Sequence, residues 1–354
     1  MNATLKRPRV LAAVVGLAAV LAACGSSGGS GSSGNTVHGG GSSFQNAFDE
    51  AVIQAYVNTN PNVTVIYAAS SSGTGKSALQ TKNVDFAGSD SLPKPGELSS
   101  YQGGKLLYFP TVAAPITVSY NLPSVKTLKL SGDTLAKIFS LKIKKWNDSA
   151  IAKDNPGVTL PSTSITVARR SDGSGTTSNF TKFLSDVDPT DWTLGHGDTV
   201  DWTSLPGSTQ GGTKNAGVAQ IVQGTAGAVG YVDLADATNS KLQTAEVENK
   251  AGKFVAPTVA GAGAAVLGAK VSPDLSYDPI NAPGAAAYPI TSPTWILVYE
   301  TQPSKDTGAA LKNFLTYVYT DGEGMAKAAG YSPLPASLIS KAQTQLSKLQ
   351  IPAS

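Results

Sequence analysis

Short apolar, strand-like runs alternate with amphipathic, helix-like runs, and this alternation constrains the fold more than any other feature of the sequence. Strands are predicted at 63–67, 84–87, 116–120, 165–168, 227–232 and 294–299, and helices at 44–56, 74–80, 135–141 and 174–184. Two more helices are predicted, one with Leu311, Phe314, Leu315 and Val318, the last through Leu338, Ala342, Leu346 and Leu349. The Ala/Gly/Pro-rich stretch 240–287 is expected to form loops and edge strands. This pattern predicts an α/β protein with open, mostly parallel sheets.

The first 23 residues are predicted to be a signal peptide, because three basic residues precede an apolar run that is too short to span a bilayer comfortably. The segment Leu21-Ala22-Ala23-Cys24 resembles the bacterial lipobox, in which the cysteine is diacylated. We therefore expect acyl chains such as palmitate on Cys24, and residues 25–34, which are only Gly and Ser, to form a flexible linker. The alternative is a signal peptide that ends near a free cysteine by chance.

Charge and cysteine usage exclude several classes of function. The chain has 27 Lys and Arg, of which three belong to the leader, so the remaining 24 balance the 24 Asp and Glu. This near-neutral balance argues against nucleic-acid binding and against a polybasic membrane patch. Cys24 is the only cysteine and there are two histidines, so no disulfide, metal site or cofactor is predicted. About 320 residues beyond the linker suffice for two domains with full cores.

The strongest candidate for a binding site is a loop between a strand and a helix. The loop Arg169-Arg170-Ser171-Asp172-Gly173-Ser174-Gly175-Thr176-Thr177 connects the strand at 165–168 to the helix at 174–184. Free N–H groups and the dipole at a helix start favour an anion. Arg170 adds a planar set of donors that suits a tetrahedral oxyanion, and Asp172 can pair with its guanidinium. The alternative is an ordinary capped loop with a surface arginine, in which Asp172 is only a loop cap.

Three other segments are candidates for parts of the same site. Gly39 to Phe44 is a glycine run into a helix start, or more of the linker. Residues 70–77 end in Gly75-Lys76-Ser77 like a phosphate loop of nucleotide hydrolases, but that motif requires a glycine where Ser70 stands. We interpret this segment as an anion-contacting loop. The third segment, 84–90, is an apolar strand that ends in an aspartate.

Asp90 predicts a protonated ligand, because an ionised carboxylate can only accept hydrogen bonds. Phosphate keeps a proton at neutral pH and sulfate does not, so Asp90 would favour phosphate and repel sulfate. The alternative is that Asp90 caps a helix that begins at Ser91 and Leu92. Trp146 follows a basic stretch, and we interpret it as a packed aromatic at a solvated helix end.

Together these segments resemble the phosphate-binding proteins of bacterial phosphate ABC transporters, the periplasmic or lipid-anchored PstS family. The resemblance covers nearly the whole chain after the linker and rests on segments in a shared order: 39–44, 71–75, 84–90, 142–147, 169–176, 227–231 and Pro289-Ile290-Thr291-Ser292. It implies a periplasmic binding protein type II fold, with two α/β lobes, a ligand in the cleft between them and two crossover strands as the hinge. One lobe would comprise 35–115 plus 290–354 and the other 116–289, with crossings near Pro115 and Pro289.

The resemblance also implies which residues bind the ligand. The implied phosphate contacts are Ser43, the backbone of Phe44, Ser72, Asp90, Arg170, Ser174, the backbone of Gly175, and Thr176, with Asp172 in support. The family loop at Ser72 usually begins Gly-Ser, so Ser71 remains an alternative to Ser72. The implied partners are inorganic phosphate and a membrane permease with two transmembrane subunits and a cytoplasmic ATPase. The protein itself would be a monomer, lipid-anchored on the extracytoplasmic face of the cell membrane and not an enzyme.

Three other functions remain open. The site could take another oxyanion such as arsenate, sulfate, molybdate or phosphonate. A secreted phosphatase would use similar donors for its transition state, but no histidine lies near Ser72 or Ser174 in the sequence. Signalling or adhesion at the cell surface also fits a lipid anchor.

Overall fold

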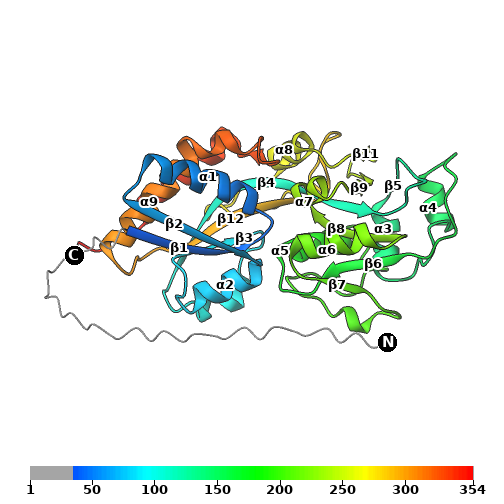
Figure 1. Ribbon diagram of the computed structural model, residues 1–354, viewed down its shortest axis with the longest axis horizontal. Helices are drawn as coiled ribbons and strands as arrows, with labels where there is room; N and C mark the ends of the chain where they lie inside the picture. The colour runs from blue at the N-terminus through cyan, green and yellow to red at the C-terminus, as the bar shows by residue number, and fades with distance from the viewer. Residues whose placement is uncertain (1–34, 354) are drawn as a thin grey trace, which may run out of the picture. The chain divides into compact units, whose positions relative to one another are not determined.

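The long strand β4 (Leu106–Tyr120) belongs to both halves of a ten-stranded sheet in the computed structural model, which describes residues 35–353 (Figure 1). The sheet has the order β2-β1-β3-β12-β4-β8-β6-β7, and two short strands also pair with β4. All but one of the residues of β4 are buried, which explains its continuous apolar sequence. The leader, Cys24 and the Gly/Ser linker lie outside the described residues.

The first half of the sheet comprises β2, β1, β3, β12 and the start of β4. Its elements are β1 (Asn35–Ser42), β2 (Val63–Ser70), β3 (Phe86–Ser89), β12 (Thr291–Tyr299), α1 (Asn46–Thr59), α2 (Ser72–Gln80), α9 (Lys305–Thr320) and α10 (Ala336–Gln345). Helices α1 and α9 cover one face of these strands and α2 covers the other (Figure 1). Short 3-10 helices lie at Pro95–Ser100 (η1), Gly322–Met325 (η3) and Leu346–Lys348 (η4).

The second half comprises the end of β4 with β8, β6 and β7. Its elements are β6 (Thr166–Arg170), β7 (Gln210–Gly212), β8 (Ala228–Asp233), α3 (Gly132–Phe139), α4 (Ser149–Asp154), α5 (Gly175–Val187), η2 (Trp202–Ser204), α6 (Lys214–Gly224) and α7 (Leu234–Asn239). Tyr231 of β8 stacks on Phe180 of α5 at 4.4 Å between ring centroids. The adjacent Gly230 faces α6, so α5 and α6 cover opposite faces of the sheet.

The remaining elements are short, apart from one helix. They are β5 (Lys129–Leu130), β9 (Gln243–Thr244), β10 (Glu246–Glu248), β11 (Phe254–Val255), β13 (Ser332–Pro333) and α8 (Val259–Gly268). β11, β10 and β5 form a separate three-stranded sheet, whereas β9 and β13 pair with β4.

Parallel pairing brings the site segments together at the carboxyl ends of strands. β1 is parallel to both β2 and β3, with Ser42 beside Ser70 and Gly41 beside Gly88. β6 is likewise parallel to β7, with Arg170 beside Gly212. Loops that leave such ends open a common edge, where open α/β sheets bind ligands.

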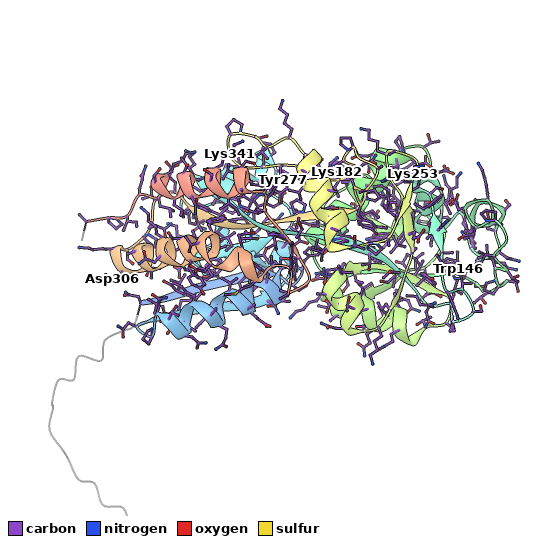
Figure 2. All side chains as sticks on the ribbon, turned by 90° about the horizontal axis from the view of Figure 1, so that it is seen from above. Trp146, Lys182, Lys253, Tyr277, Asp306 and Lys341 are labelled. Carbon is purple, nitrogen blue, oxygen red and sulfur yellow. The ribbon has the colours of Figure 1, made fainter. Side chains whose placement is uncertain are left out.

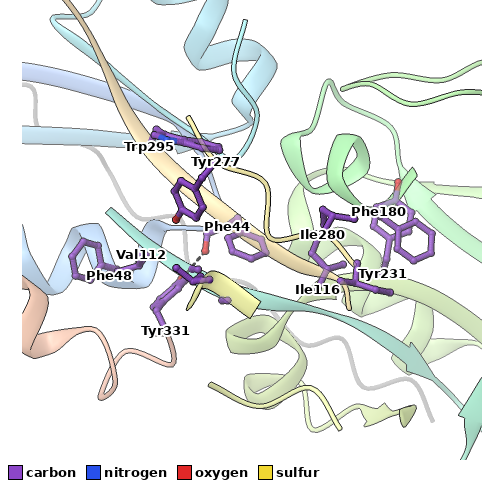
Figure 3. Close-up of a cluster of buried hydrophobic side chains, with 14 of the residues drawn as sticks. Phe44, Phe48, Val112, Ile116, Phe180, Tyr231, Tyr277, Ile280, Trp295 and Tyr331 are labelled. Carbon is purple, nitrogen blue, oxygen red and sulfur yellow. Dashed lines mark hydrogen bonds between the residues drawn. The ribbon is translucent and has the colours of Figure 1, made fainter. Parts of the chain in front are cut away.

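Aromatic pairs fix the core next to these loops (Figure 3). Phe44 packs edge-on against Tyr331, whose hydroxyl donates a hydrogen bond of 2.6 Å to the Phe44 carbonyl. The C-terminal segment thereby holds the turn that follows β1. Tyr277 and Trp295 form a second edge-on pair at 5.5 Å.

The structure corrects several expectations about the elements. The sheet is mixed, because β12 runs antiparallel to β3 and β4, and β8 antiparallel to β4. β1 was not predicted, and its glycines are neither linker nor helix start. A side chain at Gly39 would overlap the ring of Phe86, so close strand packing requires glycine there. Helix α1 begins at Asn46, two residues after Phe44.

Two helices were missed and one is shorter than expected. α6 was not predicted, and α8 lies in the stretch expected to form only loops and edge strands. Ala and Gly fill the buried positions of α8, so its sequence lacks a stripe of large apolar residues. α10 ends at Gln345, which leaves Leu349 beyond it. Within residues 35–353, no helix is both long and apolar enough to cross a bilayer.

Candidate functional site

Asp90 is the centre of the candidate site and lies directly after β3. Its side chain is buried and accepts hydrogen bonds from the hydroxyls of Ser42, Ser72 at 2.8 Å and Thr176 at 3.0 Å. These three hydroxyls come from the end of β1 and the starts of α2 and α5. Burial raises the pKa of Asp90, and the hydroxyls with the nearby Arg170 charge oppose that rise. No helix begins at Ser91, so the interpretation of Asp90 as a helix cap is wrong.

Arg170, the last residue of β6, is held by a bidentate ion pair. Its Nε donates to Asp172 Oδ1 at 2.7 Å and its Nη2 to Asp172 Oδ2 at 2.5 Å. Its remaining nitrogen, Nη1, lies 3.5 Å from Thr176 Oγ1, so the free edge of the guanidinium is directed at the residues around Asp90. Burial alone would raise the pKa of Asp172, but the Arg170 guanidinium holds it below the ordinary value. The expected pairing of Asp172 with Arg170 is therefore present.

Two helix starts meet beside Asp90. Ser71 caps α2 by accepting from Thr74 N at 3.2 Å, and Ser174 caps α5 by accepting from Thr177 N at 3.1 Å. The N–H of Gly73 in the first turn of α2 donates to the carbonyl of Gly173 at 3.0 Å. The positive ends of both helix dipoles are thus next to the buried carboxylate. The structure also separates the roles of Ser71 and Ser72, since only Ser72 bonds to Asp90.

Glycine is required where the two halves touch. A Cβ at Gly175 would lie 2.7 Å from Ser72 Oγ and 2.8 Å from Asp90 Cγ. A Cβ at Gly75 would lie 2.6 Å from Gly41 Cα. Real side chains do not approach so closely, so both positions depend on the missing side chain.

The turn after β1 contains two serines with different surroundings. Ser42 Oγ donates to Asp90 and accepts from the N–H of Phe44 at 3.0 Å. Ser43 Oγ, the predicted contact, is buried and has no hydrogen-bond partner among the described residues. Sequence reasoning missed Ser42, although the glycine run before it indicated that a backbone passes close to another segment.

Two asparagines complete the surroundings and were also missed. Asn179 Nδ2 donates to the carbonyl of Asp90 at 2.6 Å and to Ser292 Oγ at 2.8 Å. Asn215 is fully buried, its Nδ2 lies 3.4 Å from Thr176 Oγ1, and its Oδ1 has no partner among the described residues. Both lie on helices facing the site, and their sequence neighbours gave no signal.

A second buried carboxyl group supports the β1 turn from below. Asp49 accepts from Gln45 Nε2 at 2.9 Å, and the hydroxyl of Tyr67 donates to the carbonyl of Ser42 at 2.8 Å. Burial raises the pKa of Asp49 to about 8, so this group is largely protonated at neutral pH.

Two other sequence features lie outside the site. Trp146 is fully buried, and its Nε1 donates to the carbonyl of Gly227 at 2.9 Å, so it is a packed aromatic, although no helix ends there. Three aspartates that could hold a metal ion, Asp133, Asp188 and Asp191, are the one such group in the part of the chain that the structure describes. Lys137 and Lys142 form ion pairs in that cluster, which does not include Asp90.

Comparisons with known proteins agree with this geometry. A family model described as "PBP superfamily domain" matches residues 26–322. The "Phosphate-binding protein PstS" of Pasteurella multocida is 37% identical over 316 residues, which cover 88% of this chain and 89% of the relative. "Phosphate-binding protein PstS 2" of Mycobacterium tuberculosis is 35% identical over 319 residues, covering 86% of this chain and 85% of that one.

Solved structures share the fold. A periplasmic phosphate-binding protein called PfluDING, solved with bound phosphate, superposes with a TM-score of 0.73 at 21% identity, covering 90% of this chain and all of that one. A phosphate-binding protein from Stenotrophomonas maltophilia gives a TM-score of 0.69 at 23% identity, covering 88% and 93%. The sequence relationships and the shared α/β fold lead to one conclusion. The chain belongs to the PstS family of phosphate-binding proteins, within the PBP superfamily.

Proposed function

We propose that this protein is the extracytoplasmic substrate-binding component of a phosphate ABC importer. One observation carries the proposal: a buried carboxylate, Asp90, lies beside the free edge of Arg170 and three hydroxyls. Arg170 can bind an oxyanion, and Asp90 can accept a hydrogen bond from a ligand that still has a proton. Phosphate satisfies both groups at neutral pH. Sulfate would face Asp90 without a proton to donate.

The proposed phosphate contacts are Ser43, the backbone of Phe44, Ser72, Asp90, Arg170, Ser174, the backbone of Gly175, and Thr176, and we add Ser42. Two facts support this set. The hydroxyl of Ser43 is buried without a protein partner, which is costly unless a ligand supplies one. The starts of α2 and α5 also direct backbone N–H groups and dipoles to the same region.

We further propose capture by closure of two lobes, 35–115 plus 290–354 and 116–289. The continuous path of β4 past Pro115 and the 2.8 Å hydrogen bond from Ile116 N to the carbonyl of Ile290 support a hinge there. Closure removes water, which strengthens every charged contact to the ligand. A permease that prefers the open form would then release phosphate.

The cellular setting is also part of the proposal. The leader and lipobox-like segment support export and anchoring through Cys24 on the extracytoplasmic face of the membrane. The partners would be inorganic phosphate and a permease of two transmembrane subunits with a cytoplasmic ATPase, and the protein would act as a monomer without enzymatic activity. Against a phosphatase, Ser174 Oγ caps α5, and Ser72 Oγ bonds to Asp90 and not to a histidine.

Calorimetric titration of phosphate-free protein tests the function. We expect one-to-one binding of phosphate, binding of arsenate because it shares the shape and protonation of phosphate, and no heat with sulfate. Sulfate binding as tight as phosphate binding would favour a general oxyanion receptor. Release of phosphate from a chromogenic ester would favour the phosphatase.

A further inference from the structure

Asp198 lies on the segment between α5 and β7, outside the proposed phosphate contacts. It lines a cavity of about 450 Å³ next to Asp90, together with Lys182 and Tyr277, both labelled in Figure 2. This cavity lies between residues of the two halves of the sheet, so its walls move apart if the halves separate.

The contacts of Asp198 join both halves. Its Oδ2 lies 2.7 Å from Lys76 Nζ, and its Oδ1 accepts from Ser91 Oγ at 2.6 Å. Its backbone carbonyl accepts from the N–H of Ser174 at 2.9 Å. Lys76 Nζ also donates to Ser91 Oγ at 3.0 Å, which closes a triangle of polar groups.

Each partner of Asp198 adjoins the proposed phosphate site. Lys76 is on α2, whose first residue bonds to Asp90, and Ser91 directly follows Asp90. Ser174 caps the helix that contains Thr176. Asp198 therefore links the two sides of the site without belonging to it.

We propose that Asp198 is a positioning residue that latches the closed form through Lys76 and Ser91 and slows phosphate release; this inference rests on the proposed phosphate-binding function. The ion pair is shielded, with side-chain exposures of 11% for Lys76 and 20% for Asp198. Opening separates the pair and breaks a hydrogen bond to a charged group, which is stronger than a neutral one. The Arg170–Asp172 pair lies within one half, so opening leaves it intact.

The test compares Asp198→Asn, Lys76→Met and their double variant by calorimetry and by stopped-flow measurement of phosphate dissociation. We expect each single change to raise Kd about tenfold through faster dissociation, with association nearly unchanged. The double variant is expected to match the single variants, because both remove one interaction. Lys105→Met and Glu300→Gln are matched controls, since that 2.6 Å pair lies within the first half.

A second variant keeps the test independent of folding defects. Ser91→Ala removes one contact of Asp198 without leaving a charge unpaired, and we expect a smaller increase in the dissociation rate. Unchanged dissociation in the Asp198 and Ser91 variants, or fully additive effects in the double variant, would overturn the latch. If the wild-type protein fails to bind phosphate, the proposed function itself is overturned.

Discussion

Thr176 Oγ1 donates a 3.0 Å hydrogen bond to Asp90 Oδ2 and so connects residues 86 positions apart on opposite halves of the sheet. The same hydroxyl lies 3.5 Å from Arg170 Nη1. A cation and a buried carboxylate thus share one neighbour. This arrangement suits a ligand with both negative charge and a proton, and it is the basis of the first predictions.

Replacing Asp90 by Asn should relax the discrimination between phosphate and sulfate. The amide can donate a hydrogen bond to sulfate, whereas the carboxylate cannot. We expect phosphate affinity to fall by about tenfold and sulfate binding to become measurable by calorimetry. Asp85→Asn, just before the same strand, is the control and should keep the wild-type selectivity. Unchanged selectivity in Asp90→Asn would remove Asp90 from this role.

The adjacent arginines 169 and 170 should differ sharply. Arg170→Gln removes the buried guanidinium, and we expect phosphate affinity to fall by at least about a hundredfold. Arg169→Gln should leave it nearly unchanged, because the Nε of Arg169 bonds to Thr209 at 3.0 Å. Asp172→Ala should give an intermediate loss through a less ordered Arg170. Equal losses in Arg169→Gln and Arg170→Gln would contradict the assignment.

Gly175→Ala should weaken phosphate binding without destabilising the fold of either half. The added methyl group would meet Ser72 and Asp90, which lie on the opposite half, so it obstructs closure. We expect a large increase in Kd with a thermal midpoint close to that of the wild type. Gly224→Ala, with open space around it, is the control. Wild-type affinity in Gly175→Ala would show that the halves need not approach so closely.

Asp49 should make the stability of the protein depend on pH. Its pKa rises to about 8 in the folded state, whereas an unfolded aspartate titrates near its model value of 3.8. The folded state therefore holds the extra proton between these values, and stability falls as pH rises through this window. Asp49 contributes a slope of roughly 1 kcal/mol per pH unit at most.

Urea unfolding at pH 5 and pH 8 measures this effect. Asp49→Asn should lose less stability than the wild type between these pH values, since its amide does not titrate. Glu323, whose pKa burial also raises to about 8, should behave alike in Glu323→Gln, and the two changes should add. Identical pH dependence in the wild type and in Asp49→Asn would show that Asp49 is not protonated in the folded state.

Local sequence patterns predicted much of the fold. The strand at 165–168, its loop and the helix after it appear as β6 and α5, because apolar periodicity and a serine cap act within a few residues. Asp90 was correctly expected at the end of a strand. Helix α8 and strand β1 escaped detection, since small residues there satisfy distant packing and leave no local period.

The sequence by itself determined the α/β class, the family and the candidate residues around Asp90 and Arg170, because these depend on short motifs and on nearest-neighbour chemistry. Only the tertiary structure decided that Ser42 bonds to Asp90, that Ser71 caps a helix while Ser72 bonds to Asp90, and that Asp198 contacts Lys76. These contacts join segments up to 122 positions apart. The register of parallel strands and the approach of the two halves bring them together, and neither is encoded in any local pattern.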